Sequence, residues 1–308
     1  MALGPAAAAP FDVSEAQSDD AAFAWSSDAT SPARFLAVHG RRAAVFGYAD
    51  TGLEAWVYPI QVLSALHVAF RQLGASSEID AQSILRRVVY TPEGVTRIYA
   101  GPDFVVRERL FVPLDAPAVI VSYETEGVRP VDVLVRFVPE LDLMWPAGIG
   151  GQETVWNPAA GAYLLSEPTG RFAASVGSPE SFAHDDTANL ARRAGRVAGL
   201  SLTLRPAAGS HSAHLVIAGG LAQPAEDAAA ARRLLDQEPS LERSARQHYR
   251  EVLDAGLEIE TPDPEVTRAL AWAQVALEQA WVCNPDFGCG LVAGYGPSRK
   301  ARRPQYDW

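Results

Sequence analysis

The sequence predicts a mainly β protein in which a large antiparallel sandwich is followed by helices near the C-terminus. From residue 35 onward, short runs of β-branched and aromatic residues recur, separated by Gly, Pro or Asp, a rhythm typical of antiparallel strands. Roughly ten such runs precede residue 222 with almost no helical pattern among them, which favours a large sandwich. From residue 223 the chain becomes rich in Ala, Leu and Arg, which indicates helices.

The first strands are expected to form a hairpin. Residues 43–48 and 53–58 are apolar runs that flank Asp50-Thr51-Gly52, whose residue types favour a tight turn. Further strands are expected at residues 67–71, 84–90 and 95–99.

Three later strands show clear two-residue alternation, at residues 104–112, 131–141 and 200–205. Alternation of this kind places one face of each strand against a core. Glu108 is the only charge on the apolar face of its strand. It could contact a ligand or a neighbouring domain, but we favour a partnership with a nearby Arg.

Helices are expected after the sandwich. Residues 226–237 and 241–255 read as two helices interrupted at Pro239, and Gly256 is a suitable stop. A short strand-like segment, 257–260, comes next. A further helix then begins with Asp263 as its cap and Pro264 in its first turn, and ends at Asn284-Pro285.

Apolar residues recur every three or four positions along this last helix, which predicts one stripe that requires burial. The stripe consists of Val266, Leu270, Ala273, Leu277 and Ala280 or Trp281. Trp272 and Val275 widen the apolar surface, so burial is expected on more than one side. One helix cannot bury itself, and we expect it to be the first member of a helical domain that this chain does not complete.

The predicted organisation has four parts: a flexible leader at 1–33, a β-sandwich domain at 34–222, a helical linker at 223–260, and the start of a helical domain at 261–308. The first ten residues are rich in Ala and lack a basic region. They fit the tail of a signal peptide or a flexible leader, and we favour export, periplasmic or secreted, over a cytoplasmic location.

Composition excludes some functions. The 26 basic and 37 acidic residues give a net charge of -11, which argues against nucleic-acid binding and is compatible with a neutral ligand such as a sugar. No window approaches the ~20 apolar residues of a membrane helix. Cys283 and Cys289 are the only cysteines, too few for a zinc site, and we expect free thiols, with a local disulfide as the alternative. We expect no metal or other cofactor.

The glycine-rich stretch 288–300 contains Lys300 but does not fit a phosphate-binding loop. That motif needs a preceding strand, a following helix and adjacent Gly-Lys-Ser/Thr. We expect an irregular loop in which glycines permit close backbone approach.

Two segments carry a family resemblance. Pro262-Asp-Pro-Glu-Val-Thr-Arg-Ala-Leu-Ala-Trp-Ala, and 290–308 with its Gly-Tyr-Gly-Pro-Ser and Arg303-Pro304-Gln-Tyr-Asp-Trp308, resemble bacterial glycogen-debranching (amylo-α-1,6-glucosidase-type) glycosidases. Weaker similarity to their N-terminal domain lies in 53–60, 101–113 and 142–146. The resemblance implies a β-supersandwich joined to an (α/α)6 toroid of six helical hairpins, and hydrolysis of α-glucan. It is strongest over 261–308.

The resemblance also implies site residues. Tyr295, Arg303 and Trp308 would lie at the sugar-binding mouth of the barrel, and the catalytic carboxylates would lie farther along than Trp308. Glycoside hydrolysis generally needs two opposed carboxyl groups, and no such pair can be identified in this sequence. Asp307 is not assigned a catalytic role because its position in the resembled motif is variable. We therefore expect an N-terminal fragment that is inactive alone.

Other aromatic and histidine residues are given structural roles. Trp145 and Trp156 are expected in the core or an interface rather than on a sugar. His184-Asp185-Asp186 is expected to be a solvated turn, although it could bind a cation. His211 and His214 are three apart in a strand region and do not have helical zinc spacing.

Two other functions stay open at this stage. One is a non-catalytic β-sandwich module that binds carbohydrate or a protein partner. The other is a different six-hairpin glycosidase, such as a trehalase-like enzyme, because the N-terminal half does not define the linkage. The apolar stripe separates the module from the fragment: a fragment leaves it uncovered, whereas a module packs it within the chain.

Overall fold

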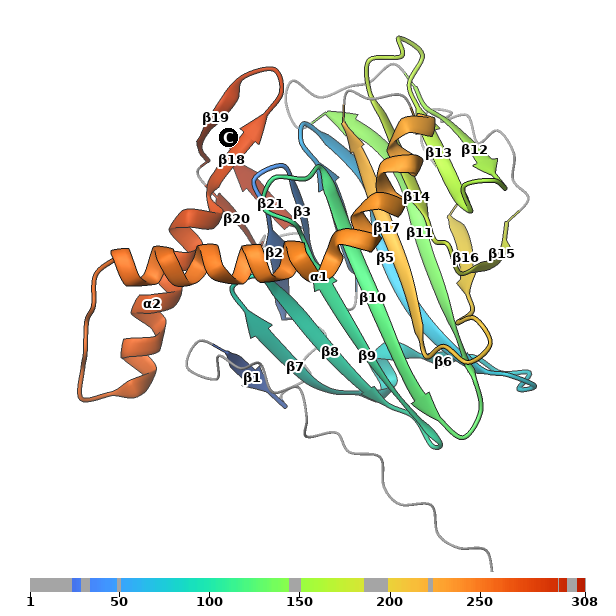
Figure 1. Ribbon diagram of the computed structural model, residues 1–308, viewed down its shortest axis with the longest axis horizontal. Helices are drawn as coiled ribbons and strands as arrows, with labels where there is room; N and C mark the ends of the chain where they lie inside the picture. Colours follow the sequence, from blue (N-terminus) through green and yellow to red (C-terminus); the bar gives the residue numbers. More distant parts are fainter. Residues whose placement is uncertain are drawn as a thin grey trace, which may run out of the picture.

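The computed structural model describes residues 24–28, 34–48, 51–143, 151–185, 199–220, 224–292, 294–297 and 304–307. Two large antiparallel sheets pack face to face, and two helices follow them in the chain (Figure 1). The predicted fold class, a mainly β sandwich followed by helices, is confirmed. No helix of the described ranges has the length and apolarity to cross a membrane.

The first sheet has nine strands and is antiparallel throughout. Its strands in spatial order are β1 (Trp25–Ser27), β7 (Leu85–Thr91), β8 (Gly94–Ala100), β9 (Phe104–Phe111), β10 (Ala118–Gly127), β17 (Ser212–Gly220), β14 (Ala173–Gly177), β13 (Ala162–Ser166) and β12 (Glu153–Asn157). The edge strand β1 lies within the segment that the sequence assigned to the leader. It forms because Trp25–Ser27 pairs with β7 in the register Trp25↔Tyr90.

The second sheet has eight strands. In order they are β15 (Ser181–His184), β16 (Leu200–Leu204), β11 (Val131–Leu143), β5 (Ile60–Gln72), β4 (Gly52–Val57), β3 (Ala43–Tyr48) and β2 (Phe35–His39), with β6 (Ile79–Asp80) beside β5 and a short 3-10 helix at Ala81–Ile84. The expected hairpin of β3 and β4 is present, with Tyr48 opposite Gly52.

The main core lies between the sheets and is made by alternate residues of their strands. On β11, Val133, Val135 and Phe137 are buried in this core while Arg136 is exposed, as the alternation predicted. Because every central strand contributes side chains at a two-residue period, the register of the sheets is fixed by burial.

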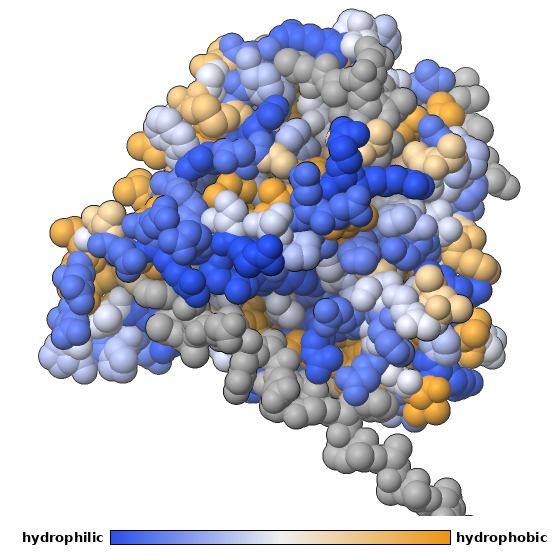
Figure 2. Space-filling view, in the orientation of Figure 1, coloured by the Kyte–Doolittle hydropathy of each residue, from blue (hydrophilic) through white to orange (hydrophobic). Residues whose placement is uncertain are grey.

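Helix α1 (Pro224–Ala255) covers the outer face of the nine-stranded sheet (Figure 1). Leu234, Leu235 and Ala245 pack on Phe111 and Ile120, while the solvent side of the helix forms a hydrophilic band across the molecule (Figure 2). The predicted interruption at Pro239 is wrong, because α1 runs through it. Apolar contacts with the sheet on both sides of Pro239 outweigh the loss of one backbone hydrogen bond.

Helix α2 (Pro264–Gln279) begins as predicted, with the Asp263 side chain accepting a hydrogen bond from the Glu265 backbone N–H. The preceding segment 257–260 is not a strand. Its backbone finds a different partner, because the side-chain amide of Gln274 bonds both the N–H and the C=O of Leu257, at 2.8 and 3.1 Å.

Helix α2 ends at Gln279 rather than at Asn284, and the chain continues into the hairpin of β18 (Trp281–Asn284) and β19 (Gly288–Leu291). Cys283 and Cys289 are directly opposite in this hairpin and form a disulfide. The expectation of free thiols is therefore wrong, because the turn between the two strands brings the two sulfurs together. A second hairpin joins β20 (Gly294–Pro297) to β21 (Pro304–Asp307).

Candidate functional site

Helix α2 presents three different faces. At about 100° per residue, Glu265, Arg268, Ala269 and Trp272 share one face, roughly 120° around the helix from the predicted apolar stripe. Val275 belongs to a third direction and is buried, with 1% of its surface exposed. The helix is thus anchored through its buried side while two other faces remain open.

The first open face of α2 forms a cleft with the β1 edge of the nine-stranded sheet. The cleft encloses about 520 Å³ and is lined by Trp25, Tyr90, Glu265, Arg268, Ala269 and Trp272. Ligand-binding clefts typically measure roughly 300–1,000 Å³ and combine aromatic walls with a few polar groups. This cleft has that composition, and we take it as the candidate functional site.

The sandwich contributes an ordered aromatic wall. Trp25 and Tyr90 are paired across β1 and β7, and their ring centroids lie 5.0 Å apart at 34°. The guanidinium carbon of Arg34 lies 4.8 Å from the centroid of Trp25, at cation–π distance. Burial raises the pKa of the Tyr90 phenol, although the Arg34 charge opposes this, so the hydroxyl is neutral at physiological pH and can donate a hydrogen bond.

The helix contributes charged groups and a third ring. Glu265 and Arg268 lie in the first turns of α2, and Trp272 follows Arg268 by four residues. Within the described ranges, neither the Glu265 carboxylate nor the Arg268 guanidinium has an ion-pair or side-chain hydrogen-bond partner. The cleft therefore offers hydrogen-bond donors and acceptors next to aromatic faces.

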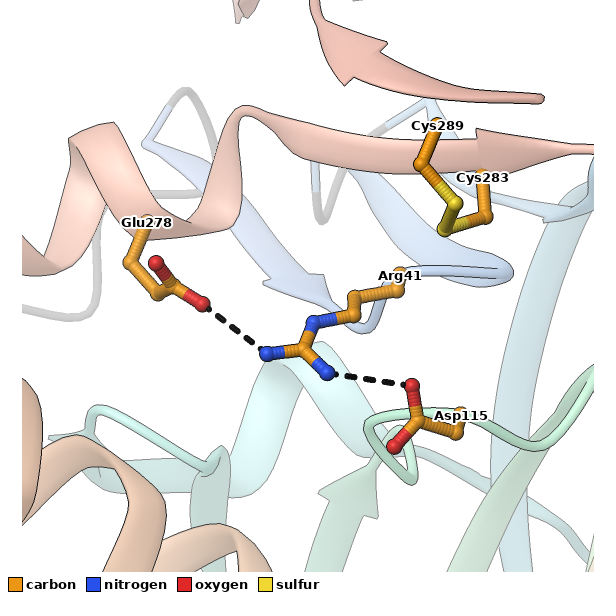
Figure 3. The surroundings of a disulfide bond; sticks show 5 residues. All are labelled: Arg41, Asp115, Glu278, Cys283 and Cys289. Atoms are coloured by element: carbon orange, nitrogen blue, oxygen red, sulfur yellow. Dashed lines mark hydrogen bonds and ion pairs between the residues drawn. A yellow bond between two sulfur atoms is a disulfide. The ribbon is translucent and has the colours of Figure 1, made fainter. Parts of the chain in front are cut away.

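Arg41 fixes α2 and the disulfide hairpin to the sandwich (Figure 3). Its guanidinium contacts Asp115 at 3.2 Å and Glu278 of α2 at 3.3 Å. Its backbone carbonyl accepts a hydrogen bond from the Cys283 N–H at 2.6 Å. Glu278 also lies 2.8 Å from Nε2 of His248 on α1. The position of the cleft-forming helix is thus set in part by polar contacts of Glu278 with Arg41 and with His248 of α1.

The second open face is an apolar surface. The described part of the chain exposes several large apolar side chains in this region, namely Leu257, Ile259, Val266, Leu277, Trp281, Phe287 and Leu291. Apolar side chains reach the surface along the margin of the molecule that contains α2 and the hairpin (Figure 2). Much of the predicted stripe is therefore uncovered within the described residues, with Val266 46% and Leu277 63% exposed, whereas Leu270 and Ala280 are half-buried.

The site residues implied by the resemblance lie at the end of the chain. Tyr295 is in β20 opposite Tyr306 of β21, and its side chain lies outside what the structure describes. Arg303, Trp308 and Trp145 also lie outside the described residues.

Trp156 and His184 both have structural roles in the sandwich. Trp156 packs against the main core and stacks on His184, with centroids 3.9 Å apart. The solvated turn expected at 184–186 does not include His184. This residue is instead the last of strand β15, and its ring lies against Trp156. Asp185 accepts a hydrogen bond from the Ser201 N–H at 2.7 Å. Asp186 lies outside the described residues.

Glu108 has the Arg partner that the sequence favoured. It is 1% exposed and pairs with Arg97 of the neighbouring strand β8. The described ranges contain no cluster of His, Cys, Asp or Glu suited to a metal ion.

Sequence reasoning missed the cleft. The spacing of Glu265, Arg268, Ala269 and Trp272 was a usable signal for a second helix face, since residues three and four apart are neighbours on a helix. The opposite wall, formed by Trp25 and Tyr90, gives no such spacing signal in the sequence. Trp25 belongs to a strand of three residues that the polar composition around it conceals.

Comparison with known proteins rests on structure. No family model matches the chain, and no curated protein is detectably similar in sequence. A bacterial glucoamylase solved in complex with acarbose aligns with 80% of this chain at TM-score 0.54 and 9% identity. A putative kojibiose phosphorylase from the human microbiome aligns with 84% at TM-score 0.45 and 6% identity.

The likeness to the glucoamylase shows the fold, a large β-sandwich followed by helix, which the two chains share. The chain spans 41% of the length of the glucoamylase and 39% of that of the phosphorylase.

Proposed function

We propose that this chain is the β-sandwich portion, with the first helix of a helical catalytic domain, of a glycoside hydrolase that acts on α-glucan. Three observations support the proposal. The fold is shared over 80% of the chain with a glucoamylase that was solved with acarbose bound. Residues 261–308 resemble debranching-type glycosidases. Much of the apolar stripe of α2, including Val266 and Leu277, is left exposed by the described part of the chain.

The uncovered stripe carries the most weight. Val266 and Leu277 belong to an amphipathic helix that is anchored on its other side by Val275 and Arg41. Exposed apolar patches of this kind mark interaction surfaces, and contact with a further protein element is one of their uses. In our proposal, further helices of the catalytic domain pack on this stripe. A stand-alone binding module would bury it within the chain, so this observation disfavours the module.

In this proposal the sandwich has a supporting role. It braces the barrel, while Tyr295, Arg303 and Trp308 contact sugar at the barrel mouth and the acid and base carboxylates are supplied by sequence beyond Trp308. Debranching is the specific activity that the resemblance implies. A trehalase-like activity is the alternative within the same architecture.

Hydrolysis assays test the proposal. We expect purified 1–308 to show negligible release of glucose from maltooligosaccharides and branched glucans, because hydrolysis needs two opposed carboxyl groups and the resemblance places these beyond Trp308. The polypeptide encoded by the complete reading frame should hydrolyse them, and trehalose serves as the comparison substrate. Robust turnover by 1–308, or a reading frame that contains no further helical hairpins, would overturn the proposal.

A further inference from the structure

We propose that the cleft between the β1–β7 edge and α2 binds a neutral oligosaccharide. The choice of an α-glucan as first probe rests on the proposed function, whereas the site itself rests on the residues that line it. Those residues are Trp25, Tyr90, Glu265, Arg268, Ala269 and Trp272.

The first step is the aromatic content of the cleft. Of its six described lining residues, three are Trp or Tyr, contributed by β1, β7 and α2. A pyranose ring presents an apolar C–H face and a rim of hydroxyls. The C–H face can pack on an aromatic ring, whose π face is electron-rich. Rings on both sides of a cleft can hold successive sugar units in this manner.

The second step is the order of the aromatic wall. Trp25 is 36% exposed, so its ring is accessible, yet it contacts Tyr90 and Arg34 and belongs to a paired strand. A ring that is already fixed loses little conformational entropy when a ligand binds. The wall is therefore preformed rather than assembled by the ligand.

The third step is the charge in the cleft. Glu265 and Arg268 provide one negative and one positive group, and neither has a partner among the described residues. An anionic ligand would be repelled by the Glu265 carboxylate, and a cationic ligand would be repelled by the Arg268 guanidinium. A neutral polyhydroxy ligand can donate to the carboxylate and accept from the guanidinium, and so satisfies both.

The same groups disfavour an apolar occupant. A hydrophobic ligand or peptide that filled the cleft would remove both charged groups from water without replacing their hydrogen bonds, which is costly. The net charge of -11 also disfavours a polyanion such as a nucleic acid. Of these ligand classes, the oligosaccharide matches every wall of the cleft.

Calorimetric titration of the 308-residue chain with maltohexaose tests the site. We expect saturable binding that is weakened at least tenfold by Trp272→Ala and by Trp25→Ala. Trp281→Ala is the matched control, because Trp281 is 41% exposed on β18 and does not line the cleft. Ala269→Arg is a second blocking variant, since it fills the cleft from an exposed helix position without removing a ring.

The outcomes separate the site from the proposed enzyme class. Loss of binding in the cleft variants but not in Trp281→Ala supports the site. Binding that survives Trp272→Ala, Trp25→Ala and Ala269→Arg overturns it, as does no binding of maltohexaose, cellohexaose or xylohexaose. Cleft-dependent binding of cellohexaose or xylohexaose alone would keep the site and count against an α-glucan substrate. Hydrolysis by the complete protein without cleft binding would overturn only the site.

Discussion

Arg97 and Glu108 form an ion pair inside the sandwich, from directly opposite positions of β8 and β9. The Tyr99 hydroxyl donates a further hydrogen bond to the same carboxylate at 2.8 Å. Burial alone would lower the pKa of Arg97, but the nearby Glu108 charge outweighs burial and raises it. Both side chains are almost fully buried, so each charge depends on the other for compensation.

Removal of one partner should therefore be costly. We expect Glu108→Leu or Arg97→Met to lower the free energy of unfolding by about 3–5 kcal/mol, because the remaining charge stays buried and unpaired. The double variant should recover most of this loss, since a fully apolar replacement of a buried pair is often neutral. Urea denaturation of all four proteins gives the coupling energy. A double variant no more stable than the worse single variant would contradict this account.

The contact of Arg41 with Glu278 predicts a local effect. Both groups are about one quarter exposed, so we expect the pair to contribute only about 0.2–1 kcal/mol to global stability. Glu278→Gln removes the charge that faces both Arg41 and His248, and it should instead loosen α2 and the β18–β19 hairpin. Amide hydrogen exchange should become several-fold faster in these elements and stay unchanged in β9 and β10.

Glu251→Gln is the matched control for this variant. Glu251 is an exposed carboxylate on α1 whose partner Gln247 belongs to the same helix. The Glu251→Gln variant should leave amide hydrogen exchange in α2 unchanged. Equal exchange rates in Glu278→Gln and the original protein would show that other contacts hold α2.

Local signals in the sequence were sufficient for most of the fold. The alternation of 131–141 located β11 and its buried face, and the Asp263-Pro264 pair located the start of α2. Both features depend on residues that are neighbours in sequence. Pro239 was misread because the contacts of α1 with the sheet, which stabilise the helix through the proline, come from residues distant in sequence.

The candidate site could not be predicted from local sequence patterns, because it also depends on residues that are distant in sequence. Its two walls come from Trp25 and from Trp272, which are far apart in the chain and meet only when β1 pairs with β7 and Arg41 positions α2. The disulfide is similar: the spacing of Cys283 and Cys289 allowed both free thiols and a bond. The hairpin register decides between them.

The disulfide should stabilise its own hairpin rather than the sandwich. Closing so short a loop is worth about 2 kcal/mol in the chain-entropy model. We expect Cys283→Ser/Cys289→Ser to speed amide exchange in β18–β19 and to leave the midpoint of sandwich unfolding almost unchanged. Tris(2-carboxyethyl)phosphine treatment of the original protein should have the same effect. A large shift of the unfolding midpoint would show that the hairpin is coupled to the whole sandwich through the contact of Val282 with Phe46 and Trp56.

The buried imidazole of His39 predicts a loss of stability in mild acid. His39 ends β2 and stacks on Phe46, with ring centroids 6.0 Å apart. Burial lowers its pKa from 6.5 to about 4. The unfolded chain therefore binds a proton first as the pH falls, so stability is lost from about pH 6.5 down to about pH 4, by up to about 3 kcal/mol.

Replacement of this imidazole should remove that part of the pH dependence. We expect His39→Leu to flatten the curve of unfolding free energy against pH between 4 and 6.5, relative to the original protein, because no group at this position then takes up a proton. His211→Leu, at an exposed histidine, should keep the original slope. Glu180 adds a smaller acid loss at lower pH, because hydrogen bonds from His214 and other groups outweigh burial and lower its pKa. Urea denaturation at half-unit pH intervals measures the slopes, and an unchanged slope in His39→Leu would contradict the assignment.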